Sequence, residues 1–429
     1  MPTKGKGKGK GKGKGKGKKG KKGRSRLSET DDVVMKKLLK CYERNCALTD
    51  SQMCPRVKAA IKAAMEGEKL LTRFILESVP QEQEGDLPVL LEPFLASIRQ
   101  ERYILIKDLH IWDYPMSYEN VATLSLLMEK PAYLVRQLEM MDCLLEANSI
   151  NRFSRIFRAC DTLTILNLDY NEFGDEGCQY LCRGLDGNVT MLSLSLCYCD
   201  LGKESGRYLG HILSTTAVRE MYLDGNNLEC EGVTELIKLC VDQAEAESFQ
   251  KAEAARIKEQ EEALKAQLEK ENRYTTRSEQ SGDAESDGAK SPAGNKKKKK
   301  GKKKKKTKEP PAPPPVGPWV YKLHIADNGI DAMGESREIA PIICMRLFRK
   351  LLMCSHCLEE LDLEDNLIGD LGGREIVEGL MYRKEEKLGG VKMRTTHRMN
   401  ADTFNTIIKL GSGLKKKKKG KKKGKKKKK

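Results

Sequence analysis

The amino-acid sequence predicts an α/β fold: a solenoid of stacked strand-turn-helix units, with an N-terminal helical cap and disordered lysine-rich arms. Three observations predict it. An apolar frame recurs along the chain, a pair of apolar residues at helical spacing follows most copies of that frame, and three runs of lysine stand apart from the rest. Even without those runs, the chain of 429 residues is long enough to bury a sizeable core.

Each copy of the frame has apolar residues at positions 1, 4 and 6 and a short side chain at position 9. In the clearest copy these are Leu163, Leu166, Leu168 and Asn171. A polar residue between the apolar positions 4 and 6 gives the period of two that a half-buried strand shows. Six further copies share this register and an eighth is worn; their ninth residues are Tyr114, Cys143, Cys199, Asn226, Asn328 and Asn366, with Thr396 in the worn copy.

A helix is predicted after most frames, because two apolar residues four apart lie on one helix face. The pairs are Leu124 and Met128, Phe153 and Phe157, Leu181 and Leu185, Leu209 and Leu213, Leu236 and Cys240, and Ile376 and Leu380. Each unit is therefore strand, turn and helix, and it buries its apolar faces only by stacking on the next unit. The ninth residue is expected inside the turn, where it satisfies buried backbone groups.

These copies resemble the leucine-rich repeats of the ribonuclease-inhibitor type, whose units have about 28 residues. The resemblance covers roughly residues 103–400 apart from one long interruption. It implies a curved solenoid with a parallel sheet on its concave face and helices outside, and it says less about function. Tyr114 departs from the pattern because it replaces Asn or Cys in the first copy. The 38 residues from Asn328 to Asn366 exceed one unit, which predicts a longer helix or loop within residues 335–356.

The composition divides the chain into six segments: a disordered Lys/Gly-rich arm (1–27), a helical N-terminal domain (28–100), repeats 1–5 (101–242), a charged helix and disordered Lys/Pro-rich insertion (243–317), repeats 6–7 with a C-terminal cap (318–410), and a disordered Lys-rich tail (411–429). The N-terminal domain is predicted to be helical from the spacing of Ile61, Met65 and Phe74, and its expected role is to cap the core. In the insertion, an apolar stripe that begins with Phe249 and Ile257 predicts a solvated helix or a short coiled coil.

Charge is segregated along the chain. Residues 1–26, 296–308 and 415–429 hold 37 of the 80 basic residues, whereas the remaining chain carries 43 basic and 62 acidic residues. A basic globular nucleic-acid-binding domain is therefore not expected. The lysine runs lack apolar residues and repel themselves, so we expect them to be disordered and to bind a polyanion such as a microtubule, RNA or anionic lipid through salt-sensitive attraction.

No catalytic site, nucleotide site, cofactor or small-molecule substrate is expected. The Gly-Lys alternation of residues 5–20 lacks the Ser or Thr that follows the lysine of a phosphate-binding loop. Cys354, His356 and Cys357 offer zinc ligands, but no second pair stands at suitable spacing, so loop or core thiols are favoured and no metal is predicted. The 14 scattered cysteines predict reduced thiols, and neither a secretory signal nor a membrane-spanning segment is expected.

The concave face is the candidate binding surface, because strand residues between the buried positions point outward. Most of the charged residues expected on it are acidic, and Lys322 is the one basic residue expected there. An exposed tryptophan together with three tyrosines is typical of a protein interface. The predicted partner-binding residues are Asp108, His110, Trp112, Asp113, Glu139, Met141, Asp142, Asp169, Tyr170, Tyr198, Glu220, Tyr222, Asp224, His324, Asp327, Glu360, Asp362, Glu364 and Asp365. They favour a basic or amphipathic protein segment as the partner; another hypothesis is that the chain's own lysine runs fold back onto this face.

The sequence thus predicts a non-enzymatic protein-protein interaction scaffold that lysine arms hold on a polyanion. Proteins of this repeat type with charged low-complexity ends resemble components of ciliary and flagellar axonemes, which implies the cytoplasm and the microtubule cytoskeleton. The alternative is a nuclear or nucleolar adaptor whose arms bind RNA and serve as import signals. A resemblance to the Ran GTPase-activating proteins is a third alternative, and no arginine at the early strand ends supports it.

Overall fold

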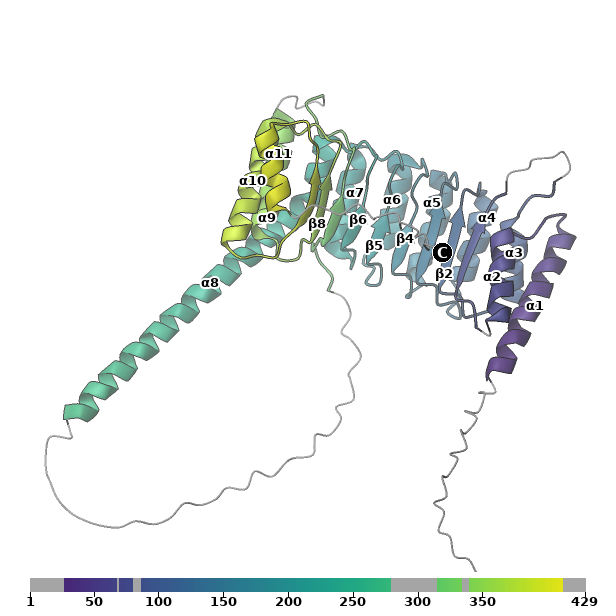
Figure 1. Ribbon diagram of the computed structural model, residues 1–429, viewed down its shortest axis with the longest axis horizontal. Coiled ribbons are helices and arrows are strands. Elements are labelled where there is room, and N and C mark those ends of the chain that lie inside the picture. The colour runs from purple at the N-terminus through teal and green to yellow at the C-terminus, as the bar shows by residue number, and fades with distance from the viewer. Residues whose placement is uncertain (1–26, 68, 80–85, 279–314, 334–338, 412–429) are drawn as a thin grey trace, which may run out of the picture.

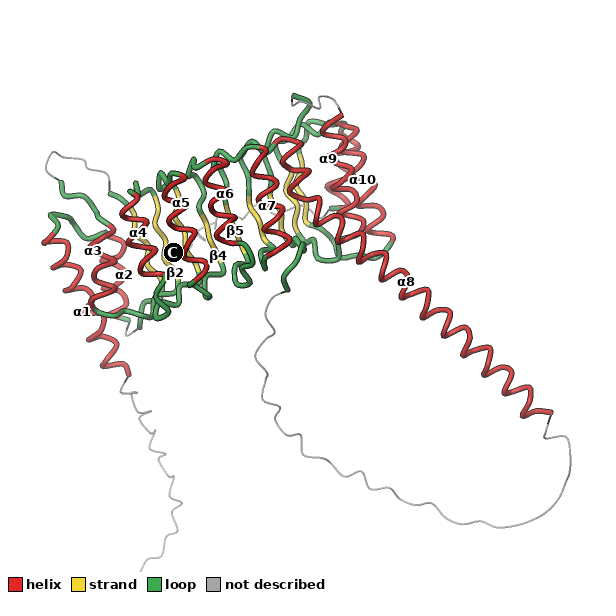
Figure 2. Tube along the Cα trace, turned by 180° about the vertical axis from the view of Figure 1, so that it is seen from behind, coloured by secondary structure: helices red, strands yellow, loops and turns green. Residues whose placement is uncertain are grey.

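The computed structural model describes residues 27–67, 69–79, 86–278, 315–333 and 339–411 (Figure 1). The predicted disordered arms and the lysine block of the insertion lie outside these residues, apart from Leu27 and Gly411 at the edges of the arms. The described chain forms one layer of strands with one layer of helices against it (Figure 2). None of the described helices is long and apolar enough to cross a membrane.

The described strands form one parallel sheet, and their order in the sheet follows the chain. They are β1 (Arg73–Glu77), β2 (Asp108–Trp112), β3 (Gln137–Met141), β4 (Ile165–Asn167), β5 (Ser193–Ser195), β6 (Glu220–Tyr222), β7 (Lys322–His324), β8 (Glu360–Leu363) and β9 (Lys392–Thr395). Each strand pairs with the next one in sequence, which is the arrangement that stacked repeats produce. The predicted α/β solenoid is confirmed.

The helices cover one face of the sheet and leave the concave face open (Figures 1 and 2). They are α1 (Leu27–Leu48), α2 (Pro55–Glu66), α3 (Leu91–Gln100), α4 (Tyr118–Met128), α5 (Ala147–Ser154), α6 (Gly174–Leu185), α7 (Lys203–Thr215), α8 (Glu229–Ser278), α9 (Ala340–Cys354), α10 (Gly369–Glu385) and α11 (Ala401–Leu410). A short 3-10 turn, Arg155–Arg158, follows α5.

The fourth residues of the frames form one buried row across the sheet. Leu166 pairs with Leu138 on one side and with Leu194 on the other, and all three side chains are fully buried. The row continues through Phe74, Leu109, Met221, Leu323, Leu361 and Met393. Because each repeat buries its side chains against its neighbours, this row is part of one continuous core.

The ninth residues link each repeat to the one before it. The side-chain amide of Asn171 donates to the carbonyl oxygens of Met140 and Leu168, each at 2.7 Å. Its Oδ1 accepts from the backbone N–H groups of Cys143 (3.0 Å) and Leu145 (3.1 Å). One buried side chain therefore satisfies four backbone groups of two successive turns, as the sequence predicted.

The same links recur along the solenoid, and we call them the ninth-position ladder. Asn226 and Asn366 each make the equivalent four hydrogen bonds. The thiol of Cys199 donates to the carbonyl oxygen of Leu168 at 3.3 Å. The departure at Tyr114 has a structural reason: this larger side chain reaches the start of α3, where its hydroxyl accepts from the N–H of Leu91 at 3.0 Å.

The N-terminal domain was predicted to be helical, and this is wrong for residues 73–77. These residues form β1, in which Phe74 is paired with Leu109 of β2. The sequence pattern does not predict this strand, because Phe74, Ile75 and Leu76 are consecutive apolar residues and hide the alternation of apolar and polar residues that marks a strand. The cap of the solenoid is consequently three helices and a strand that continues the sheet.

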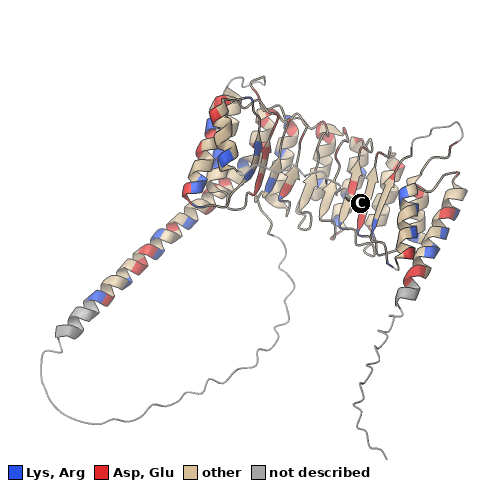
Figure 3. Cartoon of the chain, in the orientation of Figure 1, with Lys and Arg blue, Asp and Glu red and all other residues tan. Residues whose placement is uncertain are grey.

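Helix α8 runs through the predicted domain boundary at residues 242 and 243 without a break. The helix of the fifth repeat and the charged helix of the insertion are one element of 50 residues. No Gly or Pro follows Gly232 within it, and Ala, Glu, Gln and Lys, all strong helix formers, dominate its second half. At its base α8 lies so close to α7 that a Cβ on Gly206 would stand 2.0 Å from the Gly232 oxygen. Beyond the solenoid α8 projects alone and carries both charge signs (Figure 3).

At the C-terminal end the predicted eighth strand and cap are present, but the predicted register of the worn eighth copy is wrong by two residues. Met393, at position 6 of the predicted frame, pairs with Leu361 at position 4 of the seventh copy, so Thr396 does not stand at a ninth position. β9 extends the sheet, and α11 packs against it with Ile407 fully buried. Part of the surplus between Asn328 and Asn366 lies in α9, which has 15 residues, against 12 in α6 and 13 in α7.

Replacing Asn226 with alanine should destabilise the fold by at least about 2 kcal/mol, because four buried backbone groups lose their hydrogen-bond partner. Urea denaturation followed by circular dichroism measures the change. The matched control is Asn227→Ala at the neighbouring exposed residue, which should alter stability by less than about 0.5 kcal/mol. Equal stability of the two variants would show that the ladder does not hold the repeats together.

Candidate protein-binding surface

The predicted binding residues occupy two kinds of position. Residues at positions 3, 5 and 7 of the frame lie on or beside the strands and face the concave side. Residues at position 8 lie where the chain leaves the strand, and we call them the strand-end row. This row consists of Asp113, Asp142, Tyr170, Tyr198, Gly225, Asp327 and Asp365.

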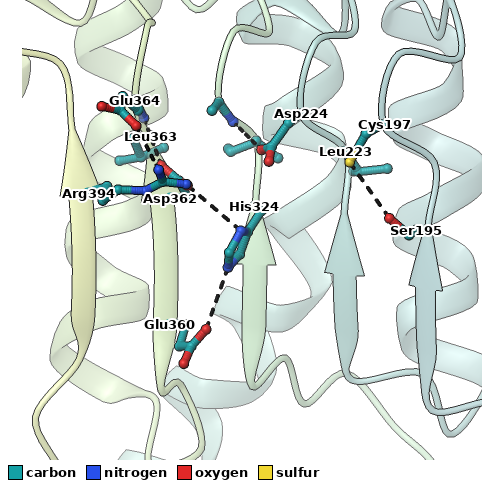
Figure 4. Close-up of polar contacts among 12 residues, drawn as sticks. Ser195, Cys197, Leu223, Asp224, His324, Glu360, Asp362, Leu363, Glu364 and Arg394 are labelled. Atoms are coloured by element: carbon teal, nitrogen blue, oxygen red, sulfur yellow. Dashed lines mark hydrogen bonds and ion pairs between the residues drawn. The ribbon is translucent and has the colours of Figure 1, made fainter. Parts of the chain in front are cut away.

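At the C-terminal end of the concave face, basic residues neutralise the predicted acidic ones. Arg394 of β9 pairs with Asp362 and, at 2.8 Å, with Glu364 (Figure 4). Lys392 of the same strand lies 2.6 Å from Glu360. The prediction of an acidic face with one base is therefore wrong at this end, because the worn eighth copy contributes two further bases.

The middle of the concave face is also paired internally. Glu220 of β6 forms an ion pair with Lys322 of β7 at 3.0 Å. Beside it Tyr222 packs edge-on against His324, with ring centroids 4.8 Å apart. These side chains bind one another across the strands, so their charges attract a partner less than free charges would.

At the N-terminal end, Trp112 is half-buried, whereas the sequence predicted an exposed side chain. Its Nε1 donates to Oε2 of Glu139 at 3.0 Å, and Nδ1 of His110 lies 3.0 Å from the same oxygen. Burial raises the pKa of Glu139, but hydrogen bonds, first that with His110, outweigh this effect and lower the pKa. Glu139 thus holds the tryptophan in place. Next to it in the sheet, Asp108 pairs with Arg73 of β1 at 3.1 Å.

Three residues predicted to be on the surface, His110, Asp169 and Asp362, are buried. The carboxylate of Asp169 accepts hydrogen bonds from Ser195 Oγ at 2.7 Å and from the N–H of Cys197 at 2.8 Å. Asp362 is fully buried beneath its ion pair with a base of the next strand. Cross-strand partners cover these side chains, so they support the surface and do not form it.

One cluster among the described residues brings three potential metal-ligand atoms within 4.8 Å of one another. It consists of Asp224, His324 and Asp362 (Figure 4). Both carboxylates already have partners: Asp224 accepts from the N–H of Ala326 at 2.8 Å, and Asp362 pairs with Arg394. Burial, reinforced by the charge of Asp362, raises the pKa of Asp224 despite the hydrogen bond from Ala326. Sequence spacing did not reveal this cluster because its members come from three repeats.

Cys354, His356 and Cys357, considered above as zinc ligands, do not belong to such a set in the described chain. Their loop is organised by Arg383, a buried residue of α10. Its guanidinium donates to the carbonyl oxygen of Leu352 at 2.9 Å and to carbonyl oxygens further along the loop. The loop is therefore held by hydrogen bonds from a single arginine.

The strand-end row differs from the concave face because its carboxylates are free. Asp113, Asp142, Asp327 and Asp365 are exposed, and none forms an ion pair or side-chain hydrogen bond with another described residue. Each residue of the row has a left-handed backbone, with φ between 50° and 72°. Asp and Gly tolerate this conformation, whereas bulky residues rarely adopt it.

Two tyrosines occupy the middle of the row. Tyr170 and Tyr198 stack with their ring centroids 4.9 Å apart and their planes at 4°, and they are 50% and 44% exposed. Their φ angles are 62° and 55°. The ring of Tyr198 covers Gly225, where a Cβ would stand 2.2 Å from Cε1 of the ring, so only glycine fits there.

A cavity of about 380 Å³ lies beside the tyrosines, lined by Trp112, Asp113, Met141, Asp142 and Tyr170. The structure thus brings together five of the predicted residues, which come from three successive repeats. They meet because positions 7 and 8 recur at the same edge of each repeat.

Sequence reasoning missed four residues of these surfaces: Cys197, Gly225, Lys392 and Arg394. The repeat register would have placed all four, since they stand at concave or strand-end positions of their copies. Cys197 lies half-buried beneath the tyrosines, and burial raises its pKa to about 12, which keeps the thiol neutral.

Asp224→Asn should stabilise the protein at neutral pH, because it removes a buried charge beside Asp362 while Oδ1 still accepts from Ala326. A carboxyl whose pKa is raised in the folded state costs stability as pH rises through that pKa, so the advantage should shrink as pH falls toward 4. Thermal unfolding between pH 8 and pH 4 measures it.

Asp327→Asn, which neutralises an exposed carboxylate, is the matched control. A stability difference for Asp224→Asn that depends on pH no more than that of the control would contradict the raised pKa of Asp224.

Comparisons with known proteins agree with the repeat architecture. A family model described as "Leucine Rich repeat" matches residues 159–182 and 354–377. The ribonuclease inhibitor of Mus musculus is 30% identical over 119 residues, which are 27% of this chain and 26% of the inhibitor. The ribonuclease inhibitor of Sus scrofa is 28% identical over 133 residues, 30% of this chain and 29% of the inhibitor. NACHT, LRR and PYD domains-containing protein 4B of Mus musculus is 29% identical over 143 residues, which are 32% of this chain and 16% of that protein.

The chain spans less than a third of the length of these relatives. Each of the two ranges that the family model matches covers a strand of this structure, the turn after it and most or part of the helix that follows. The repeats of this chain are leucine-rich repeats similar to those of the ribonuclease inhibitors.

Proposed function

We propose that this protein is a non-enzymatic scaffold that binds a protein partner through its strand-end row and the concave face beside it. Leucine-rich repeat solenoids commonly use such extended surfaces for binding. The observation that carries the proposal is the composition of the row. Free carboxylates flank two exposed, stacked tyrosines, and these tyrosines have a left-handed backbone that tyrosine rarely adopts.

The row indicates the chemistry of the partner. Tyrosine is enriched at the centres of protein interfaces, and unpaired charges steer a partner of opposite sign. The carboxylates lie toward both ends of the row, in repeats 1, 2, 6 and 7, with the tyrosines between them. A segment with basic residues around an amphipathic centre would match this pattern.

Tyr170→Asn combined with Tyr198→Asn should weaken partner binding at least about tenfold while changing the free energy of unfolding by less than about 1 kcal/mol. Asn tolerates the left-handed backbone, and this gain offsets the lost stacking. The partner is found by placing a photo-crosslinking phenylalanine analogue at position 170 in the full chain and purifying the product. Affinity is then measured by calorimetry.

The control position for crosslinking is Tyr382 on α10, which is exposed on the helical face. The proposal predicts a product from position 170 that position 382 does not give. Crosslinking from position 382 alone, or unchanged affinity in the double variant, would count against it.

We also propose that the lysine runs bind a polyanion, and the segregation of 37 basic residues into three runs supports this. Cosedimentation with microtubules and filter binding of RNA should weaken at least about tenfold between 50 and 200 mM salt. A chain without residues 1–26, 296–308 and 415–429 is the control and should bind neither polymer. Binding that survives both high salt and the deletion would contradict the proposal.

For localisation we propose the ciliary or flagellar axoneme, with the nucleus or nucleolus as the alternative. Imaging of the tagged full chain in detergent-extracted ciliated cells separates them. Retention on the axoneme supports the first, whereas a nucleolar signal that disappears with the lysine runs would replace it with the RNA adaptor.

A further inference from the structure

We propose that the cavity between Trp112 and Tyr170 accepts a single lysine or arginine side chain of the protein partner. This inference rests on the proposed function and makes it more specific. It concerns one end of the strand-end row, where an aromatic side chain of the concave face meets two free carboxylates.

The composition of the cavity favours a cation. Trp112 and Tyr170 supply aromatic rings, which attract a cation through their π faces. Asp113 and Asp142 supply two carboxylates that have no ion-pair partner among the described residues, and Met141 adds an apolar, polarisable contact. An apolar side chain would desolvate both carboxylates without replacing their contacts to water, so it would bind less well.

The size of the cavity favours one side chain over a larger ligand. Its volume of about 380 Å³ lies at the lower end of the range for small-molecule sites, and it opens at the strand ends. An extended stem that carries an ammonium or guanidinium group fits such a site, because the stem contacts the rings while the charge reaches the carboxylates.

The backbone supports a binding role for these residues. Asp113, Asp142 and Tyr170 all have left-handed backbones, with φ of 50°, 51° and 62°. For tyrosine this conformation is disfavoured because Cβ approaches the following carbonyl oxygen, and Asn or Gly at position 170 would avoid most of that strain. A strained aromatic residue at the mouth of an acidic cavity is the pattern expected when binding, and not stability, selects the residue.

The chain already contains one cation near Trp112. The guanidinium carbon of Arg56 lies 5.7 Å from the centroid of the tryptophan ring, and Arg56 also pairs with Glu77 at 2.7 Å. Arg56 does not line the cavity, so it leaves the two free carboxylates without a cation. The ring of Trp112 therefore makes one cation–π contact within the chain, outside the lining of the cavity.

The two tryptophans of the chain make a direct test possible. Trp319→Phe leaves Trp112 as the sole indole, whose N–H signal is followed by NMR in the full chain labelled with ¹⁵N-indole tryptophan. The probes are the N-acetyl amides of arginine and lysine, compared at constant ionic strength with those of citrulline and norleucine, which have similar length and no charge. Circular dichroism checks that the Trp319→Phe chain is folded.

We expect the arginine and lysine amides to shift the Trp112 signal in a saturable way. The affinity of the neutral amides, taken from the same titration, should be at least tenfold weaker. Asp113→Asn with Asp142→Asn should weaken binding at least tenfold, and Asn keeps the left-handed backbone. Asp327→Asn with Asp365→Asn, the matched pair at the far end of the row, should leave it unchanged. Equal shifts with all four amides, or no saturable shift with any, would overturn the inference.

Failure of the inference can be told apart from failure of the proposed function. A purified partner whose affinity falls in the double tyrosine variant but not in Asp113→Asn with Asp142→Asn would overturn the cation pocket and keep the scaffold. A partner unaffected by either pair of substitutions would overturn both.

Discussion

The side chain at the ninth position is the constraint on which the other surfaces depend. Asn171 fixes two successive turns at once, because its amide group bonds carbonyl and N–H groups of both. With the turn fixed, the residue before it has little choice of backbone, and Tyr170 takes φ of 62°. The ladder that holds the repeats together is therefore accompanied by a regular row of left-handed residues along the edge of the sheet, one from each of the seven repeats.

That row separates the demands of stability from those of binding. Asp and Gly satisfy a left-handed turn at little cost, and five of the seven positions carry one of them. Tyr170 and Tyr198 do not suit the turn, and their stacking recovers only part of the strain. The concave face shows the opposite arrangement: its acidic residues are paired across the strands, as Glu220 is with Lys322. Compared with the paired concave face, the unpaired carboxylates and exposed aromatic rings thus lie at the strand ends, where the backbone is left-handed.

Sequence pattern predicted the features that repeat and missed those that depend on neighbours. The ninth residues and the buried fourth residues were recognisable because each copy shows them in the same register. β1 was missed because three consecutive apolar residues hide its alternation, and the continuity of α8 was missed because a change in composition resembles a boundary. Arg394 pairs with Asp362 of the preceding repeat, and Asp169 is buried by Ser195 of the following one. Such contacts join residues about 30 apart, so no single copy of the frame contains them.

The insertion shows that the register of the sheet does not depend on the length of chain between two neighbouring strands. About a hundred residues separate Met221 of β6 from Leu323 of β7, yet the two residues are direct register partners. Asn328 still donates to the carbonyl oxygen of Leu223 at 2.9 Å, but its buried Oδ1 has no partner among the described residues, unlike that of Asn366. Within the described chain, Asn328 therefore makes only the donor half of the four hydrogen bonds that Asn171, Asn226 and Asn366 make. A solenoid of this kind can carry a long insertion where one turn contributes fewer bonds, and the cavity at Trp112 lies four repeats away, so changes in the insertion need not disturb it.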